Sequence, residues 1–198
     1  INDPNKLSKL EKATCGTQKV YLGQGFVIKH CDSNNCALRE TRTSLANTAI
    51  RDSNYSHLII PRILARKEEY LVEERLPICK SVKESQIIYE TNRDAFTPAV
   101  KQFPDILIRY NFTDLLQLGF GPVRFKTPTP RYDNICPYLK EGEGRLGLVD
   151  LEHFEEWHIP FLSLSADVKY CNKTTCNTLI HLFPLHFKEI LEVMEARG

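Results

Sequence analysis

The sequence lacks the features that indicate a membrane or a nucleic-acid partner. Its formal net charge is only +1 over 198 residues, so we expect no strong electrostatic attraction to nucleic acid or to a lipid surface. No apolar run approaches the roughly 18 to 20 residues that are needed to span a bilayer. No basic patch surrounds the scattered aromatic residues. We therefore expect a soluble protein with no nucleic-acid partner and no membrane insertion.

Common catalytic motifs are missing as well. The sequence contains no Gly-x-Ser-x-Gly, no Walker loop and no His-Glu-x-x-His, which argues against the enzyme classes that carry these motifs. His153 and His158 are five residues apart, as are His181 and His186. This spacing does not place two metal ligands on one face of a helix. There is also no internal repeat and no low-complexity tract.

The length and the 42% of hydrophobic residues suffice for one domain with a real core, with room for two small lobes. The cysteine count of seven is odd. Two cysteine pairs share a gap of four residues, Cys31 with Cys36 and Cys171 with Cys176. Unpaired thiols, disulfides and a metal site all remain open for these four residues.

The cellular location is not fixed by the sequence. Three Asn-x-Ser/Thr sequons occur, at Asn54, Asn111 and Asn172. Together with the cysteine count they hint at a secreted protein.

Residues 1–77 carry mainly strand patterns and one helical pattern. Residues 1–13 are polar and predict a short helix or an irregular lead-in. Strands are predicted at 20–22 and 26–30 around a turn at 23–25, and again at 57–64 and 69–73 around Lys67 and Glu68. A helix is predicted at about 36–52, with an apolar stripe formed by Leu38, Leu45, Ala49 and Ile50.

Residues 78–198 carry mainly helical patterns. Helices are predicted near 84–102 and 104–118, and a last helix begins near Pro184. The inner face of the last helix is predicted to consist of Phe187, Ile190, Leu191 and Met194. Residues 123–140 contain several prolines and predict irregular structure, followed by a strand at 146–151.

One lysine stands in a strand pattern that is typical of buried positions. Lys29 follows Val27 and Ile28 near the end of the second predicted strand. The Cys15–Tyr21 segment before it contains Gly16 and runs into Val-Tyr, and backbone amides in such a loop can hold a phosphate. A strand lysine facing water is the alternative interpretation of Lys29.

The order of these parts resembles the protein kinase-like superfamily over roughly residues 14–155. Members have a Gly-rich loop between the first two strands, a lysine on the third strand and a glutamate on the next helix. The resemblance implies that Gly16 and Lys29 contact the phosphates of ATP, and that Glu40 pairs with Lys29. The 70–77 segment, with Glu73, resembles the hinge strand that meets the adenine.

The resemblance also implies a metal site in the second half. Asp150 ends an apolar strand, and Asn134 precedes that strand, so these two residues are expected to hold Mg²⁺. The catalytic-loop aspartate of the family is replaced by Thr129, and Asp133 or a water is the remaining candidate for the proton acceptor. Loss of that base slows phosphoryl transfer by about 10²- to 10⁴-fold, and nucleotide binding can survive it.

We therefore predict an α+β, two-lobed, kinase-like fold. Residues 1–77 form an N-lobe with a small antiparallel sheet and one helix, and residues 78–198 form a reduced, mostly helical C-lobe. The predicted function is that of a pseudokinase that binds a nucleotide, a protein partner or both, with ATP and Mg²⁺ as cofactors. A minimal active phosphotransferase and a binding module with a closed nucleotide cleft are the alternatives.

Overall fold

A computed structural model describes residues 9–13, 19–78, 81–109, 132, 135–149, 179 and 182–197. The chain forms two compact units. The first unit consists of Ile1–Thr48 and Ile60–Pro77, and the second of Ala49–Ile59 and Ile78–Gly198. Both units contain helix and strand residues, so the predicted α+β class is confirmed.

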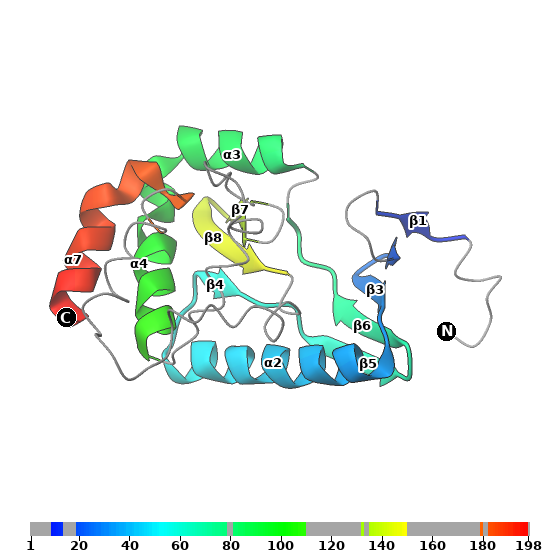
Figure 1. The fold of residues 1–198 in the computed structure, drawn as a ribbon. Coiled ribbons are helices and arrows are strands. Elements are labelled where there is room, and N and C mark those ends of the chain that lie inside the picture. Colours follow the sequence, from blue (N-terminus) through cyan, green and yellow to red (C-terminus); the bar gives the residue numbers. More distant parts are fainter. Residues whose placement is uncertain are drawn as a thin grey trace, which may run out of the picture. The chain divides into compact units, whose positions relative to one another are not determined.

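The first unit contains a five-stranded sheet in the order β1-β2-β3-β6-β5, with every neighbouring pair antiparallel. Figure 1 draws its strands in blue to blue-green. Strands β3 and β6 each have a hydrogen-bonded neighbour on both sides. The strands are β1 (Glu11–Lys12), β2 (Val20–Leu22), β3 (Phe26–His30), β5 (Ile63–Lys67) and β6 (Tyr70–Glu74).

Local sequence explains the hairpin between β2 and β3. Gly25 adopts φ +79°, a left-handed conformation that glycine reaches without strain. The backbone N–H of Gly23 donates to the carbonyl of Phe26 at 2.9 Å and closes the turn. The prediction of two strands around this turn is confirmed. Strand β1, in contrast, lies in the segment predicted as a helix or an irregular lead-in.

The helix after β3 is α2 (Ser33–Asp52), close to the predicted bounds. Its buried positions are Cys36, Arg39, Thr43, Ala46, Ala49 and Ile50. Leu45 was predicted to belong to the inner stripe, but its exposed fraction is 56%. The buried face includes a polar residue and a charged one, which a pattern of apolar residues does not detect.

The predicted strand at 57–64 is two strands that belong to different sheets. Strand β4 (Leu58–Ile59) pairs in parallel with β8 (Glu143–Leu148) in the second unit, whereas β5 joins the sheet of the first unit. Pro61 stands between them, in a stretch without strand pairing. A proline has no N–H to offer to a ladder, so a break is expected there.

The second unit contains a three-stranded sheet in the order β4-β8-β7 and several helices. Its remaining elements are α3 (Val82–Thr91), α4 (Arg93–Arg109), β7 (Ile135–Lys140), β8 (Glu143–Leu148), the 3₁₀ turn η2 (Pro184–His186) and α7 (Phe187–Arg197). Strands β7 and β8 form an antiparallel hairpin. This unit therefore has more strand structure than the single strand predicted for it.

Helix α4 is the centre of the second unit, with α7 on one side and the sheet on the other (Figure 1). Five apolar residues of α4 recur at helical spacing and are fully inaccessible: Phe96, Ala99, Val100, Phe103 and Ile106. The predicted break before residue 104 is wrong, because Pro98 and Pro104 both lie inside α4. The helices divide instead at Asn92, whose side chain caps the carbonyl of Ile88 at 2.9 Å.

Residues 135–140 were predicted to be irregular and form strand β7 instead. Pro137 lies in the middle of it. Strand β7 is at the edge of its sheet, the position in which a strand tolerates proline. Gly144 of β8 allows close packing against α4, because a Cβ there would lie 2.6 Å from the carbonyl oxygen of Ala95.

The last helix begins near Pro184, as predicted, with one 3₁₀ turn before α7. Ile190 and Met194 are buried, but Phe187 is 48% exposed and does not belong to the inner face. Within the described residues, no helix combines the length and the hydropathy that crossing a bilayer requires.

Candidate functional site

Lys29 lies on β3, the third strand of the first sheet. Its side chain is only 12% exposed. The alternative that this lysine faces water is therefore wrong. A charged amine in such a position requires a compensating partner, because desolvation of an isolated ammonium is very costly.

Glu73 of β6 forms an ion pair with Lys29. The Lys29 Nζ atom lies 2.9 Å from the Glu73 Oε2 atom, and the glutamate side chain is 5% exposed. In the strand register Lys29 is opposite Leu71, so Glu73 is its diagonal neighbour on the same face of the sheet. Two long side chains can bridge that diagonal.

Glu40 has a different partner from the one predicted. Its Oε2 atom lies 2.8 Å from Nε of Arg66, and both side chains are about 40% exposed, at 39% and 43%. The ion pair links α2 to β5, the edge strand of the sheet. The predicted Lys29–Glu40 pair is replaced by two pairs, Lys29–Glu73 and Glu40–Arg66, because the strand next to β3 offers a carboxylate that the sequence pattern assigned to a hinge.

The first unit also contains a disulfide. Cys31 and Cys36 are bonded to each other. They join the chain just after β3 to the first turns of α2, and they pack against Leu71 and Ile63. Of the alternatives left open for this cysteine pair, the structure shows the disulfide. Cys171 and Cys176 lie outside the described residues.

The other predicted site residues also lie outside the described part of the chain. They are Gly16, Thr129, Asp133, Asn134 and Asp150. In sequence, Gly16 falls between β1 and β2, the first two strands of the sheet. Among the residues that the structure describes, no group of three or more His, Cys, Asp or Glu side chains could hold a metal ion. The roles assigned to these five residues stay predictions.

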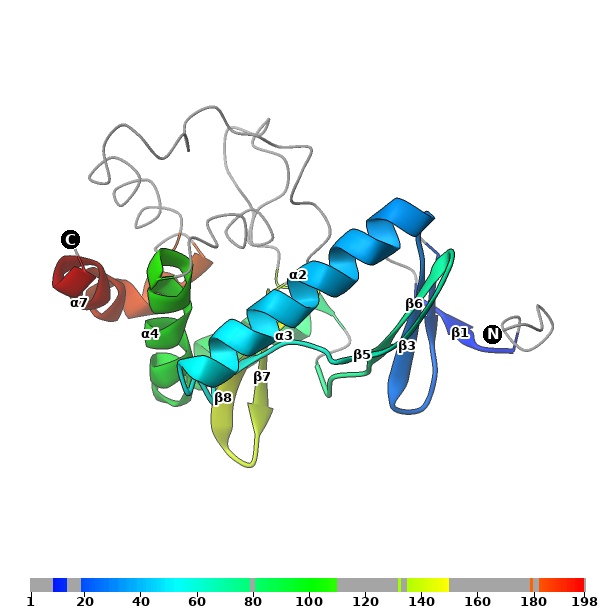
Figure 2. The same ribbon diagram turned by 90° about the horizontal axis from the view of Figure 1, so that it is seen from below.

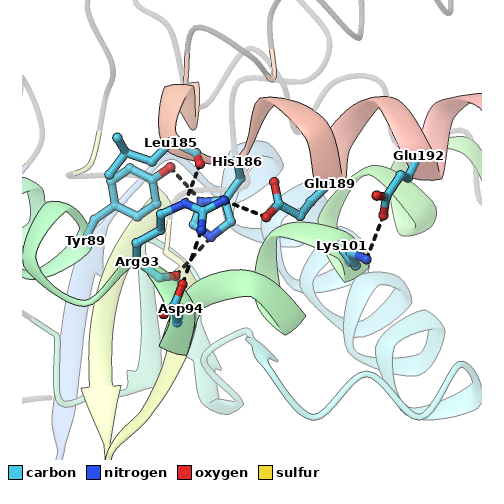
Figure 3. A network of polar contacts seen from close by, with 8 residues as sticks. All are labelled: Tyr89, Arg93, Asp94, Lys101, Leu185, His186, Glu189 and Glu192. Atoms are coloured by element: carbon cyan, nitrogen blue, oxygen red, sulfur yellow. Dashed lines mark hydrogen bonds and ion pairs between the residues drawn. The ribbon is translucent and has the colours of Figure 1, made fainter.

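The second unit contains a buried polar network around His186, shown in Figure 3. The hydroxyl of Tyr89 lies 2.9 Å from Nδ1 of His186, and Nε2 of the imidazole lies 3.0 Å from the carbonyl oxygen of Arg93. A carbonyl only accepts, so Nε2 carries the proton in neutral His186, and Nδ1 accepts from the tyrosine. The imidazole thereby connects α3, α4 and the turn η2.

Burial is the main cause of the pKa shifts of His186 and Tyr89. It lowers the pKa of His186 and raises the pKa of Tyr89. At the edge of the network the Arg93 guanidinium contacts Glu189 at 2.7 Å and the carbonyl of Leu185 at 2.7 Å. The backbone N–H of Glu189 itself, followed by Arg93, lowers the pKa of that carboxyl. Each contact attaches α7 or its preceding turn to α4, so we interpret the network as structural.

Glu73 is the residue whose role sequence reasoning misjudged. It was expected at the hinge because the 70–77 segment resembles the strand and hinge that join the two lobes of the kinase-like superfamily. The signal that could have identified it is the alternation in β6, where Leu71 and Glu73 are buried on one face at 0% and 4% exposure. A glutamate in phase with a core leucine on a strand requires a cationic partner.

Comparisons with known proteins give little further information. No protein-family model matches the chain, and no curated protein sequence matches it. Among solved structures, the chain is similar to an aminoglycoside phosphotransferase in the streptomycin-ATP-APH(2")-IIa ternary complex, at 13% identity and a TM-score of 0.32. The similarity covers 73% of this chain and 66% of the other, slightly less than two thirds. At this TM-score it establishes neither a shared fold nor a shared activity.

Proposed function

We propose that the chain is a degenerate kinase-like domain that binds ATP, with Lys29 as the contact to the phosphates. The observation that carries the proposal is the Lys29–Glu73 ion pair, with an Nζ to Oε2 distance of 2.9 Å and side chains only 12% and 5% exposed. It holds an ammonium group in the middle of an antiparallel sheet.

Stability alone is a poor explanation for this pair. Well-packed apolar side chains of the same volume are often as stabilising as a buried ion pair, or more so. An amine carries three N–H donors, so a contact with one carboxylate is compatible with contacts to phosphate oxygens.

The order of elements in the first unit supports the same proposal. Gly16 falls between the first two strands, Lys29 is on the third, and a helix follows directly. This is the order that the kinase-like superfamily requires for holding the phosphates of a nucleotide. Strand β1 (Glu11–Lys12) pairs with β2, so the segment that contains Gly16 connects two paired strands.

The proposal assigns the metal to residues of the second unit. Asn134 and Asp150 offer the oxygen donors that Mg²⁺ prefers. Bound Mg²⁺ would neutralise phosphate charge. Lys29 would also neutralise phosphate charge, and Glu73 would keep its amine in place. With Thr129 at the position of the family's aspartate, the domain would act as a pseudokinase, through its nucleotide or through a protein partner.

A minimal phosphotransferase is the second candidate. Retention of a buried lysine–carboxylate pair favours it, because phosphoryl transfer depends chiefly on positioning and charge neutralisation. Asp133 or a water would then accept the proton of the acceptor hydroxyl. Transfer of labelled γ-phosphate to an acceptor, lost in Asp150→Ala and in Lys29→Ala, distinguishes this candidate from a pseudokinase.

A thermal-shift titration with ATP and Mg²⁺ tests the proposal. We expect the melting temperature to rise with ATP concentration and to saturate. The double variant Lys29→Met with Glu73→Gln removes the amine without leaving a lone charge in the sheet, so it should fold and lose the shift. A wild-type protein that shows no shift at millimolar ATP refutes nucleotide binding and leaves the binding module with a closed cleft.

We also propose that the protein passes through an oxidising compartment. The Cys31–Cys36 disulfide supports this, because such bonds are rare in reducing cytosol. Asn54 supports it further, since this sequon asparagine is exposed in a turn after α2, at φ 56°. Mass spectrometry of protein from its natural source should find a glycan on Asn54. Unmodified Asn54 together with free Cys31 and Cys36 thiols would contradict the proposal.

A further inference from the structure

The kinase-like resemblance places the lysine's acidic partner on a helix, whereas the structure places it on a strand. In the superfamily the pair depends on the position of that helix, and activation controls it. Here Glu73 belongs to β6, the hydrogen-bonded neighbour of the lysine's own strand. The two arrangements differ in which part of the fold fixes the amine.

Both members of the pair are on inner strands of the sheet. Strand β3 is held between β2 and β6, and β6 between β3 and β5. All five register positions between β3 and β6 are paired without a bulge, from Phe26–Glu74 to His30–Tyr70. The separation of Lys29 and Glu73 along this ladder is therefore set by backbone hydrogen bonds, and a shift of a helix does not change it.

The helix glutamate is engaged elsewhere in the same unit. Glu40 contacts Arg66 of the edge strand at 2.8 Å, where both side chains are partly exposed to solvent. Figure 2 shows β5 and β6 as a hairpin beside β3. A partly exposed pair of this kind contributes little free energy to stability. It attaches α2 to the sheet without orienting Lys29.

We propose that Glu73, and not Glu40, is the positioning residue for the Lys29 amine, so that phosphate binding does not depend on the placement of α2. This inference rests on the proposed nucleotide function. It gives Glu73 a role on the phosphate side of the site in place of the hinge role expected from the sequence. It also implies that the contact between Glu73 and the amine is in place before the nucleotide arrives, because both residues belong to paired strands of one sheet.

Binding of ATP and of adenosine by four proteins tests the inference. The variants are Glu73→Gln, Glu73→Asp, Glu40→Gln and, as a matched control, Glu74→Gln, which removes an adjacent carboxylate that pairs with Arg62. We expect Glu73→Gln to weaken ATP binding at least about tenfold, because a charge-assisted contact that fixes the amine is lost. Glu73→Asp should recover part of the affinity, and the Glu40→Gln and Glu74→Gln proteins should bind ATP within about twofold of wild type.

The affinity for adenosine distinguishes an effect on the position of the Lys29 amine from a general loss of structure. It has no phosphate, so its affinity should be unchanged in Glu73→Gln if Glu73 acts through Lys29. Equal losses of affinity for ATP and for adenosine would place Glu73 at the adenine and overturn the inference. If Glu73→Gln does not fold, the Glu73→Asp and Glu40→Gln proteins decide the question by the same comparison.

The outcomes also separate the inference from the proposed function. A wild-type protein that binds no ATP refutes the function. A wild-type protein that binds ATP, with binding weakened by Glu40→Gln and unaffected by Glu73→Asp, refutes only the role of Glu73.

Discussion

Removal of the Glu73 carboxylate should destabilise the first unit strongly. The glutamate side chain is 5% exposed and its lysine partner 12% exposed. Removing one partner of a buried ion pair typically costs about 3 to 5 kcal/mol, because the remaining charge is left in a poorly solvated position. The slight exposure of Lys29 allows some hydration, so we expect Glu73→Gln to cost about 3 kcal/mol of unfolding free energy, at the lower end of that range.

The pair as a whole should contribute much less than either partner alone suggests. In the double variant Lys29→Met with Glu73→Leu, both charges are replaced by apolar groups of similar size. Such replacements are often neutral or stabilising, so we expect its unfolding free energy to lie within about 1 kcal/mol of wild type. A cycle made of Lys29→Met, Glu73→Leu and their double variant should then give a coupling energy of at least about 2 kcal/mol, which is typical of residues in direct contact.

Urea denaturation followed by circular dichroism measures these differences. With a slope of about 1 to 3 kcal/mol per molar urea, a loss of about 3 kcal/mol lowers the midpoint by roughly 1 M or more. Glu74→Gln is the matched control, because its pair with Arg62 is exposed by 37% and 73% and should contribute at most about 1 kcal/mol. A Glu73→Gln protein as stable as Glu74→Gln would refute the buried pair, as would a coupling energy near zero.

Three further predictions concern the second unit. Burial lowers the pKa of His186, so the unfolded chain gains a proton near pH 6.5 that the folded chain resists, and stability falls as the pH drops below about 6.5. Thermal melts between about pH 5 and 8 should show that the melting temperature depends less on pH in His186→Gln than in wild type. An equal pH dependence in the two proteins would contradict this role of His186. Gly144→Ala would place a Cβ 2.6 Å from the carbonyl oxygen of Ala95 and should cost about 1 to 3 kcal/mol in urea melts. An unaltered midpoint would show that β8 and α4 pack less closely. Phe103→Ala empties a fully buried position and should cost about 3 to 5 kcal/mol, whereas Phe187→Ala at 48% exposure should cost under about 1 kcal/mol. Similar losses for the two would contradict the assigned core.

Local patterns in the sequence predicted the centre of the first unit well. Strands β2 and β3, the glycine turn between them and the helix α2 all follow from signals that lie within a few residues of each element. The buried position of Lys29 also follows from its apolar neighbours Val27 and Ile28. These features depend little on the rest of the chain, which is why the sequence suffices for them.

Features that depend on distant partners were missed. Strand β1 has two exposed charged residues and exists only through its pairing with β2. Strand β7 contains Pro137 and is tolerated because it is an edge strand, which no local signal reveals. In α4, Pro98 and Pro104 would predict breaks, but burial of one apolar face outweighs them. Tertiary packing overrode local propensity in each case.

In the candidate site, too, local features were predicted correctly and a distant partner was missed. The sequence identified Lys29 as a buried amine but assigned it the wrong carboxylate, because the choice between Glu40 and Glu73 depends on strand register. A helix glutamate eleven residues later and a strand glutamate forty-four residues later are equally plausible from sequence alone. The register Lys29–Leu71 decides between them, since it brings Glu73 to the diagonal position.

Labelling with an ATP analogue that carries a lysine-reactive acyl phosphate tests the central claim most directly. The amine that contacts the phosphates attacks the acyl group, and the modified peptide is identified by mass spectrometry. We predict that Lys29 is acylated, that excess ATP with Mg²⁺ suppresses the labelling, and that exposed lysines such as Lys83 are not protected. Absence of labelling at Lys29, or labelling that excess ATP does not reduce, would contradict the claim that this amine binds a nucleotide.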